Sequence, residues 1–190
     1  INDNSVILCS NTSMQRKIIQ DPHPALRAIA QEVHVNEIAS ERVQNVIRDL
    51  HDTLATQPDG VAISAPQIDE SVRVFVVSPK TYGNRSDGMP TVFINPVITA
   101  SSKQTETGEE GCLSIRWVYG DVERPKNVTV TALDENGNEF TVEASGFIAR
   151  VFQHEIDHLD GILFTDKALS VKRMSDDEIT QMQTRMREGM

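Results

Sequence analysis

The stretch VFQHEIDHLDGILF, from Val151 to Phe164, places two histidines four residues apart with a glutamate beside the first. On an α-helix, residues i and i+4 share a face, so His154 and His158 can present both imidazoles to one metal ion. Glu155 would then lie close enough to exchange protons with a water that the metal activates. The same pattern also fits an ordinary polar turn of a surface helix, so it needs support from elsewhere in the chain.

The residues that follow His158 exclude one class of zinc protease. In the longer H-E-x-x-H-x-x-G-x-x-H pattern the last histidine is the third metal ligand, and that position is Phe164 in this chain. Phenylalanine cannot bind a metal, so a third ligand must come from another segment. Gly161 is better interpreted as a helix stop, because glycine tolerates the left-handed conformation that ends many helices.

Length, composition and charge limit the classes of protein to which the chain can belong. Its 190 residues suit one domain with a real core, and 38% hydrophobic with 24% charged residues is ordinary globular composition. The formal charge of −10 argues against general nucleic-acid binding and against an anionic membrane surface, because both require cationic patches. No apolar run approaches the ~20 residues of a membrane span, and no secretory or transit signal is visible. We therefore expect a cytoplasmic protein.

The N-terminal residues and the two cysteines bear on domain organisation and on a possible disulfide. We expect residues 1–13 to form a flexible extension and residues 14–190 to form a single catalytic domain, with Met14 as an alternative start. A disulfide between Cys9 and Cys112 is disfavoured because nothing else indicates secretion. Cys9 is interpreted as a small, partly buried hydrophobe.

Hydrophobic periodicity predicts a helix followed by several strands. Ser40 is a good N-cap for a helix near residues 41–56. Enrichment in β-branched and aromatic residues predicts strands at 72–78, 91–98 and 127–133. The last of these strands leads into a predicted hairpin with Asn136-Gly137 in its turn.

The second half of the chain adds two predicted helices. One runs from about Phe147 to Leu159, and we expect it to direct Phe147, Ile148, Val151 and Phe152 toward a core. Ser175 opens a capping box with Glu178, followed by a polar helix to about Glu188. The predicted fold is therefore α+β: short, mostly antiparallel strands around a central H-E-x-x-H helix, with an N-terminal and a C-terminal helix.

Cys112 is the best candidate for the missing metal ligand. It lies in TGEEGCLSIRW beside Gly111, which permits close approach of the backbone. A thiolate with two imidazoles is a legitimate set of three protein ligands that leaves one coordination position open. Thiolate and imidazole together suit Fe(II), zinc, cobalt or nickel.

Three motifs, taken together and in order, resemble those of the peptide deformylase family. EGCLS (Glu110–Ser114) and QHEIDH (Gln153–His158) match fully. The glycine-rich motif G-x-G-x-A-A-x-Q is matched imperfectly by GVAISAPQ (Gly60–Gln67). The resemblance runs from about Met14 to Lys167.

This resemblance implies an activity, a cofactor and a set of site residues. The activity is removal of the formyl group from N-formylmethionyl peptides, on nascent chains emerging from the ribosome. The cofactor is one divalent metal ion, Fe(II) in cells, with zinc, nickel or cobalt as substitutes in preparations. The implied residues are the metal ligands Cys112, His154 and His158; the catalytic Glu155, Gln67 and Leu113 backbone N–H; and the substrate-binding Gly60, Val61, Ala62 and Val151.

The chain also departs from the family's pattern, and two alternatives remain open. Ala62 replaces a glycine, Ser64 replaces an alanine, and Arg116-Trp117 stand where the family often has Pro-Gly. We expect these departures to alter efficiency and substrate range more than reaction type. The alternatives are an H-E-x-x-H endopeptidase, which the Cys112 motif opposes, and a deformylase-like protein that binds metal or peptide without turnover.

Overall fold

Eight strands form two antiparallel sheets in the computed structural model of the chain, which describes residues 15–188. The strands are β1 (Ala62–Ser64), β2 (Val74–Val77), β3 (Val92–Ser101), β4 (Thr105–Cys112), β5 (Ile115–Pro125), β6 (Asn127–Leu133), β7 (Glu139–Ser145) and β8 (Ala168–Arg173). One sheet has the order β1-β2-β3-β6-β7 and the other has the order β4-β5-β8. The extension expected at residues 1–13, including Cys9, lies outside the described residues.

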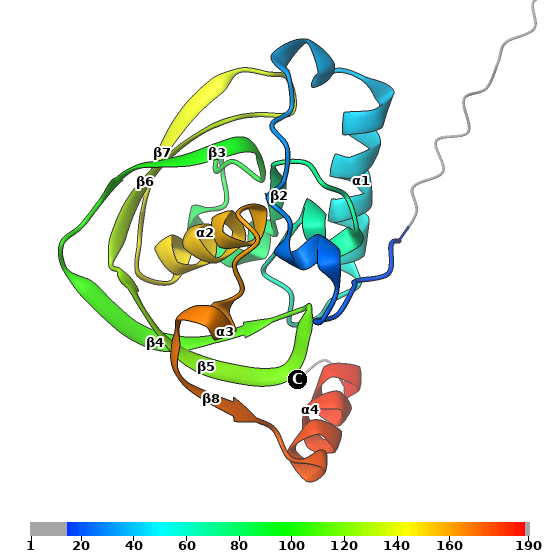
Figure 1. Ribbon diagram of the computed structural model, residues 1–190, viewed down its shortest axis with the longest axis vertical. Coiled ribbons are helices and arrows are strands. Elements are labelled where there is room, and N and C mark those ends of the chain that lie inside the picture. The colour runs from blue at the N-terminus through cyan, green and yellow to red at the C-terminus, as the bar shows by residue number, and fades with distance from the viewer. Residues whose placement is uncertain (1–14, 189–190) are drawn as a thin grey trace, which may run out of the picture.

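The first three α-helices pack against strands of these sheets, and the second lies between the two sheets, as Figure 1 shows. They are α1 (Glu41–Ala55), α2 (Gly146–Leu159), α3 (Phe164–Lys167) and α4 (Asp176–Glu188), with short 3₁₀ helices η1 (Pro24–Arg27), η2 (Val35–Glu37), η3 (Ala65–Ile68) and η4 (Pro79–Arg85). The predicted α+β class with mostly antiparallel strands is confirmed.

Strand β2 lies between two layers of helix, which explains its unbroken run of apolar residues. Val74 and Val76 belong to the core cluster that includes the buried face of α1. Phe75 and Val77 point the other way, into the cluster that includes the buried face of α2. Because successive side chains of a strand point to opposite faces, a strand covered on both sides must be apolar throughout.

The predicted N-terminal helix and hairpin are confirmed with small shifts of their bounds. The Ser40 hydroxyl accepts a hydrogen bond from the backbone N–H of Val43 at 3.3 Å and so caps α1. In the β6–β7 turn, Gly137 has a φ of +83°, which glycine adopts without steric cost. The Asp134 carboxylate accepts hydrogen bonds from the backbone N–H groups of Asn136 and Asn138 at 2.8 Å each.

Helix α2 is enclosed by strands of both sheets. It contacts β1, β2, β3, β6 and β7 of the larger sheet and β5 of the smaller one (Figure 1). Val151 and Phe152 are buried as expected, but Phe147 is 58% exposed, so its predicted core position is wrong. Phe147 lies in the first turn of α2 and lines the pocket described below, whereas Ala149 in the same turn is buried.

The turn after α2 requires a glycine. Gly161 has a φ of +73°, which confirms the predicted helix stop. A Cβ atom at this position would lie 2.6 Å from the carbonyl oxygen of Arg27, so no other residue fits without movement of the backbone. The close approach brings the N-terminal segment against the end of α2.

The C-terminal helix α4 begins with the predicted capping box. The Ser175 hydroxyl and backbone N–H both donate to the Glu178 carboxylate at 2.8 Å. None of the described residues of α4 is buried, and the helix lies beside the smaller sheet in Figure 1. Among residues 15–188, no helix has both the length and the apolar character needed to cross a membrane.

Candidate active site

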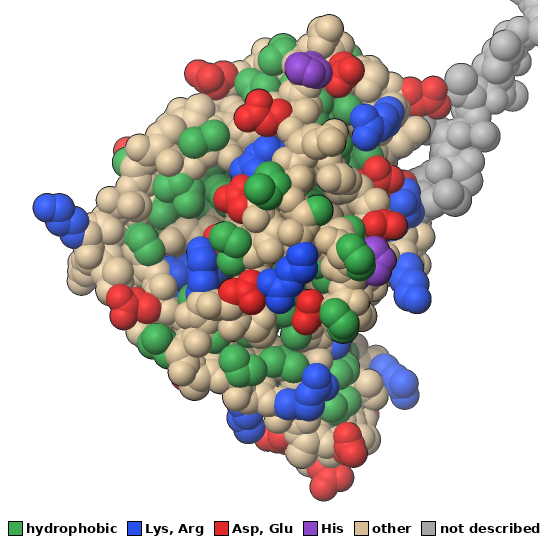
Figure 2. All heavy atoms as spheres, viewed as in Figure 1, with side chains coloured by type: hydrophobic (Ala, Val, Ile, Leu, Met, Phe, Trp, Pro, Cys, Tyr) green, Lys and Arg blue, Asp and Glu red, His purple; other side chains and the backbone are tan. Residues whose placement is uncertain are grey.

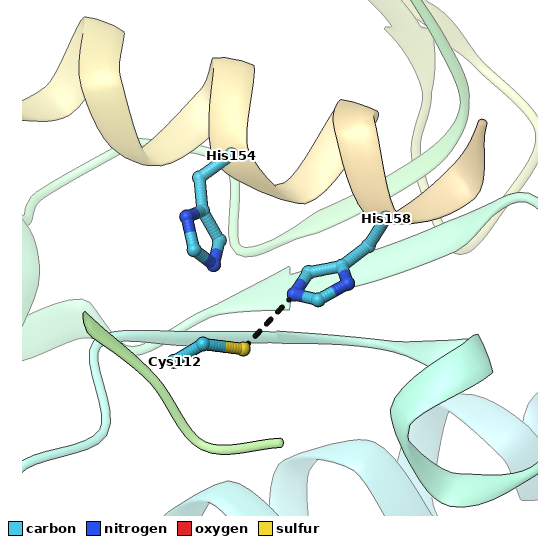
Figure 3. A group of neighbouring side chains, drawn as sticks. All are labelled: Cys112, His154 and His158. Atoms are coloured by element: carbon cyan, nitrogen blue, oxygen red, sulfur yellow. Dashed lines mark hydrogen bonds between the residues drawn. The ribbon is translucent and has the colours of Figure 1, made fainter. Parts of the chain in front are cut away.

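Three potential metal ligands from two elements meet beside α2. His154 and His158 lie one turn apart on this helix, and Cys112 is the last residue of β4. Their ligand atoms all lie within 4.8 Å of one another, and Cys112 Sγ is 3.2 Å from His158 Nε2. Figure 3 shows both imidazoles directed toward the cysteine sulfur. The structure therefore brings together the three residues that the sequence analysis selected.

An irregularity in the β4–β5 ladder accompanies the placement of Cys112. Gly111 pairs with Tyr119, but Cys112 pairs with Ile115, so the register shifts between these two residues of β4. Such bulges bend a strand and re-aim the side chain that follows. The Tyr119 ring covers Gly111 so closely that a Cβ there would lie 2.8 Å from it. The strand end thus turns Cys112 toward α2.

A buried carboxylate orients His154. His154 Nδ1 is 2.9 Å from Glu110 Oε2, which leaves Nε2 free to face Cys112. Arg124 donates to both oxygens of Glu110, at 2.6 and 2.9 Å, and to Asp157 at 2.8 Å. Burial alone would raise the pKa of Glu110, but hydrogen bonds from Arg124 and His154 hold it well below its usual range. Metal-binding histidines commonly have such a carboxylate behind them.

This supporting network of charges was not predicted from the sequence. Arg150, whose role was left open, donates to Glu110 at 2.8 Å and to the carbonyl oxygens of Glu106 and Val122. Arg124 follows the inward positions Val118, Gly120 and Val122 of β5 at a spacing of two. A charged residue on the inward face of a strand was the available signal that a buried partner exists.

The electrostatics of the cluster suit a cation. Burial alone would lower the pKa of His154, but hydrogen bonds with Cys112 and Glu110 outweigh it and raise the pKa to about 10. Burial and the nearby His154 lower the pKa of His158 well below its usual value. The side of the cluster between Cys112 and His154 therefore attracts positive charge, which a divalent metal ion would provide.

Glu155 and His158 carry buried polar atoms without a hydrogen-bond partner. Among the described residues, Glu155 Oε2 and His158 Nδ1 are the buried side-chain atoms of this kind. Glu155 is 4% exposed, and burial raises its pKa to about 7. A carboxyl group with such a pKa can both accept and return a proton near neutral pH.

Phe164 covers the imidazole of His154. The two rings are stacked, with their centroids 6.2 Å apart.

Gln67 lies opposite these residues, on η3. Its Nε2 is 3.5 Å from Cys112 Sγ and 3.2 Å from Ser114 Oγ. Leu113, the residue after Cys112, packs in the core cluster of α1, which fixes the backbone at the turn between β4 and β5. An amide N–H₂ and a backbone N–H beside the cluster of Cys112, His154 and His158 are donors of the kind that stabilises an oxyanion.

A pocket of about 250 Å³ opens onto the cluster. Its lining includes nine of the ten residues predicted for the site: Gly60, Val61, Ala62, Gln67, Cys112, Leu113, Val151, His154 and Glu155. His158 lies behind them and is 1% exposed. The predicted residues thus form one concave surface, although they come from segments up to about a hundred positions apart.

Of the residues that depart from the family's pattern, Ala62, Arg116 and Trp117 line this pocket, whereas Ser64 is fully buried. Ala62 is 5% exposed and packs in the core cluster of α2 while lining the pocket. Arg116 donates to Asp59 at 2.7 Å across the pocket mouth. Trp117 has a φ of +64°, a conformation that costs a bulky residue roughly 1–2 kcal/mol and costs glycine little.

Two imidazoles, a cysteine sulfur and an unpaired carboxyl group at one end of a pocket are the arrangement of a mononuclear metal-dependent hydrolase. Comparison with known proteins narrows this class. Residues 15–174 match the family model described as polypeptide deformylase. A peptide deformylase of Rhodopirellula baltica is 40% identical over 157 residues, which span 81% of this chain and 73% of the relative. One of Pseudothermotoga lettingae is 41% identical over 162 residues, spanning 85% and 88%.

Solved structures agree with the sequence relatives. The Met-Ala-Ser-bound crystal structure of class I type b peptide deformylase from Acinetobacter baumannii is 35% identical, with a TM-score of 0.72 over 82% of this chain and 99% of that chain. The peptide deformylase of Thermotoga maritima is 33% identical, with a TM-score of 0.73 over 83% and 99%. The chain belongs to the polypeptide deformylase family.

Proposed function

We propose that Cys112, His154 and His158 hold one divalent metal ion, with which this hydrolase removes the N-terminal formyl group from formylmethionyl nascent polypeptides and releases formate. The observation that carries the proposal is the convergence of three ligand atoms within 4.8 Å at the end of a pocket, in a member of the deformylase family. The donor set of one sulfur and two imidazole nitrogens fits Fe(II), which we propose as the metal in cells, and also zinc, nickel or cobalt.

Each reacting group has a proposed partner among the residues of the pocket. When bound, the metal ion would act as a Lewis acid that makes water a nucleophile near neutral pH. Glu155 accepts the proton of the water that attacks the formyl carbon, and it returns this proton to the peptide nitrogen as the C–N bond breaks. The Gln67 amide and the Leu113 backbone N–H donate hydrogen bonds to the formyl oxygen as negative charge develops there. The unpaired Oε2 of Glu155 supports its role, because a buried carboxyl oxygen without a partner is free to act on substrate.

The substrate is proposed to bind as an added strand. β1 is an edge strand of the larger sheet, paired on one side with β2, so its other side can pair with an extended peptide. The backbone of Gly60 and Ala62 would contact the peptide, and Val61 and Val151 would contact the methionine side chain. The structure of the relative from Acinetobacter baumannii with bound Met-Ala-Ser supports a short methionyl peptide as the ligand class.

The setting of the reaction follows from the same proposal. Residues 14–190 act as a single deformylase-like catalytic domain in the cytoplasm, on chains emerging from the ribosome. On the face shown in Figure 2, acidic and basic side chains are interspersed, which supports a role without nucleic-acid binding. The two alternatives, an endopeptidase and a non-catalytic binding protein, are not favoured by the family comparisons.

Formate release tests the proposal directly. Protein purified anaerobically with Fe(II) is expected to release one formate per formyl-Met-Ala-Ser consumed, leaving Met-Ala-Ser intact. Cleavage of unformylated peptides would indicate an endopeptidase instead. Binding of formyl-Met-Ala-Ser without formate release would indicate the non-catalytic alternative. Chelation should abolish release, and added Fe(II), nickel or zinc should restore it to different extents.

A further inference from the structure

Ser64 occupies a buried position at the centre of the pocket's polar contacts. It is the last residue of β1 and the N-cap of η3, and it is 0% exposed. The family's motif has alanine at this position, so the hydroxyl group is a feature of this chain rather than of the motif it resembles. A buried hydroxyl that made no useful contact would be destabilising.

The hydroxyl and the backbone of Ser64 both hold the Gln67 side chain. Gln67 Oε1 accepts from the Ser64 backbone N–H at 2.9 Å and from Ser64 Oγ at 3.0 Å. A backbone N–H can only donate, so the atom that faces it must be the amide oxygen. The amide nitrogen of Gln67 is thereby directed to the opposite side, toward Cys112 and Ser114. The two Ser64 donors thus fix which end of the amide faces the metal cluster.

We propose that Ser64 is a positioning residue for the deformylation reaction: its hydroxyl holds and polarises the Gln67 amide so that the N–H₂ group faces the formyl oxygen. This inference rests on the proposed function. The backbone N–H alone would orient an amide at this position, as it can where alanine is present. The hydroxyl adds a second donor to the same oxygen, which opposes rotation of the amide and strengthens its N–H as a donor.

A double-mutant cycle tests whether Ser64 acts through Gln67. Ser64→Ala should lower kcat for formyl-Met-Ala-Ser about 3- to 10-fold with little change in KM, because one neutral hydrogen bond is lost. In a Gln67→Ala background, the same substitution should change kcat less than about 1.5-fold, since its target is gone. An equal loss in both backgrounds would overturn the proposal, because the hydroxyl would then act independently of Gln67.

A matched control separates positioning from general stability. Thr53 is also 0% exposed, and its hydroxyl accepts a hydrogen bond from the Arg16 backbone N–H at 2.9 Å, away from the pocket. Thr53→Val removes that hydroxyl at constant shape. It should lower the thermal midpoint by an amount similar to Ser64→Ala but leave kcat unchanged.

A spectroscopic measurement makes the inference independent of turnover. The side-chain N–H₂ signals of Gln67, assigned by their loss in Gln67→Ala, should be dispersed and slowly exchanging in the unsubstituted protein. In Ser64→Ala, their hydrogen exchange should accelerate at least about 10-fold, as expected when a restraining hydrogen bond is lost. Unchanged exchange would refute the positioning role even if the protein releases formate. Absence of formate release would count against the proposed function alone.

Discussion

The two walls of the pocket are built by different physical means. The metal wall includes Cys112, His154 and Glu155, supported by the buried His158 and by the charged residues Glu110, Arg124 and Asp157. The donor wall includes Ala62 and Gln67 on β1 and η3, and the Gln67 side chain is held by hydrogen bonds from the buried Ser64 that involve no formal charge. The motifs on the metal wall match the family fully, and Ala62 and Ser64, two of the departures, belong to the donor wall and its support.

This difference follows from what each wall must do. The metal wall must hold its ligands in fixed positions around a positive charge. The charged side chains buried behind it need partners of opposite charge, because an unpaired buried charge is destabilising. A donor wall needs only neutral N–H groups at the correct distance, and small changes there cost about as much as one hydrogen bond. We therefore expect substitutions on the metal wall to have large effects and those on the donor wall to have graded ones.

The largest expected effect is that of Glu155→Ala. The variant should bind the metal normally but lose about 10²- to 10⁴-fold in kcat, because it removes the proton carrier and leaves the three ligands. Formate release and metal analysis on the same sample check both statements. Asp160→Asn, an exposed carboxylate at the end of the same helix, is the control and should retain activity. If the Glu155 variant keeps more than about a tenth of kcat, another group handles the proton.

Arg124→Met should mainly affect stability. It leaves Glu110 and Asp157 buried without their common partner, and breaking such a pair costs about 3–5 kcal/mol. The thermal midpoint should fall by roughly 6–20 °C, as measured by calorimetry. Arg173→Met, on the exposed strand β8, should shift the midpoint by about a degree or two. Equal midpoints for the two variants would show that the metal wall does not depend on its buried ions.

Ala62→Gly tests the departure on the donor wall. Removing the methyl group should raise kcat/KM for formylmethionyl peptides about 3- to 30-fold, mainly through KM, because less crowding would remain where we propose that the peptide pairs with β1. Stability should fall by about 1 kcal/mol, since glycine in a strand is unfavourable. Ala144→Gly, in β7 of the same core cluster but outside the pocket lining, should lower stability without changing KM. An unchanged KM for Ala62→Gly would mean that the pocket accommodates this alanine.

The smallest effect is expected for the ion pair between Arg116 and Asp59 at the mouth of the pocket. Arg116 and Asp59 are 26% and 31% exposed in their side chains, and an exposed ion pair contributes about 0–1 kcal/mol. Arg116→Gln should change KM by no more than about 2-fold, and this change should vanish in 0.5 M salt. A larger effect that persists at high salt would indicate direct contact between Arg116 and substrate.

The elements that could be predicted from sequence are those with strong local signals. Helix α1 has a capping serine and a regular apolar face, and the β6–β7 hairpin has alternation and an Asn-Gly turn. No bounds could be predicted for β4, β5 or β8. Most residues of β4 and β8 are exposed, and β5 carries charged residues among its buried positions. Their pairing comes from tertiary contacts, which local propensity does not report.

In the candidate site, too, residues with a local sequence signal could be predicted, and residues placed by tertiary contacts could not. Residues within motifs, such as His154, Glu155 and Cys112, were identified because spacing and chemistry are visible in one sequence. Arg124 was missed because a charged residue in a strand normally indicates a solvent-exposed face. Phe147 was placed in the core by its helical spacing, but it lines the pocket and is 58% exposed. Whether a helix face is covered depends on distant segments.

The position of Phe164 affects how quickly a bound metal ion can be removed from the proposed site. Its ring covers His154, it is itself 1% exposed, and His158 is equally inaccessible, so small molecules reach the ligand atoms from the side of the pocket. A chelator and a peptide must then use the same opening. A slowly dissociating peptide would block the access of the chelator to the metal. The rate at which the chelator removes the metal would therefore report how long the peptide stays bound.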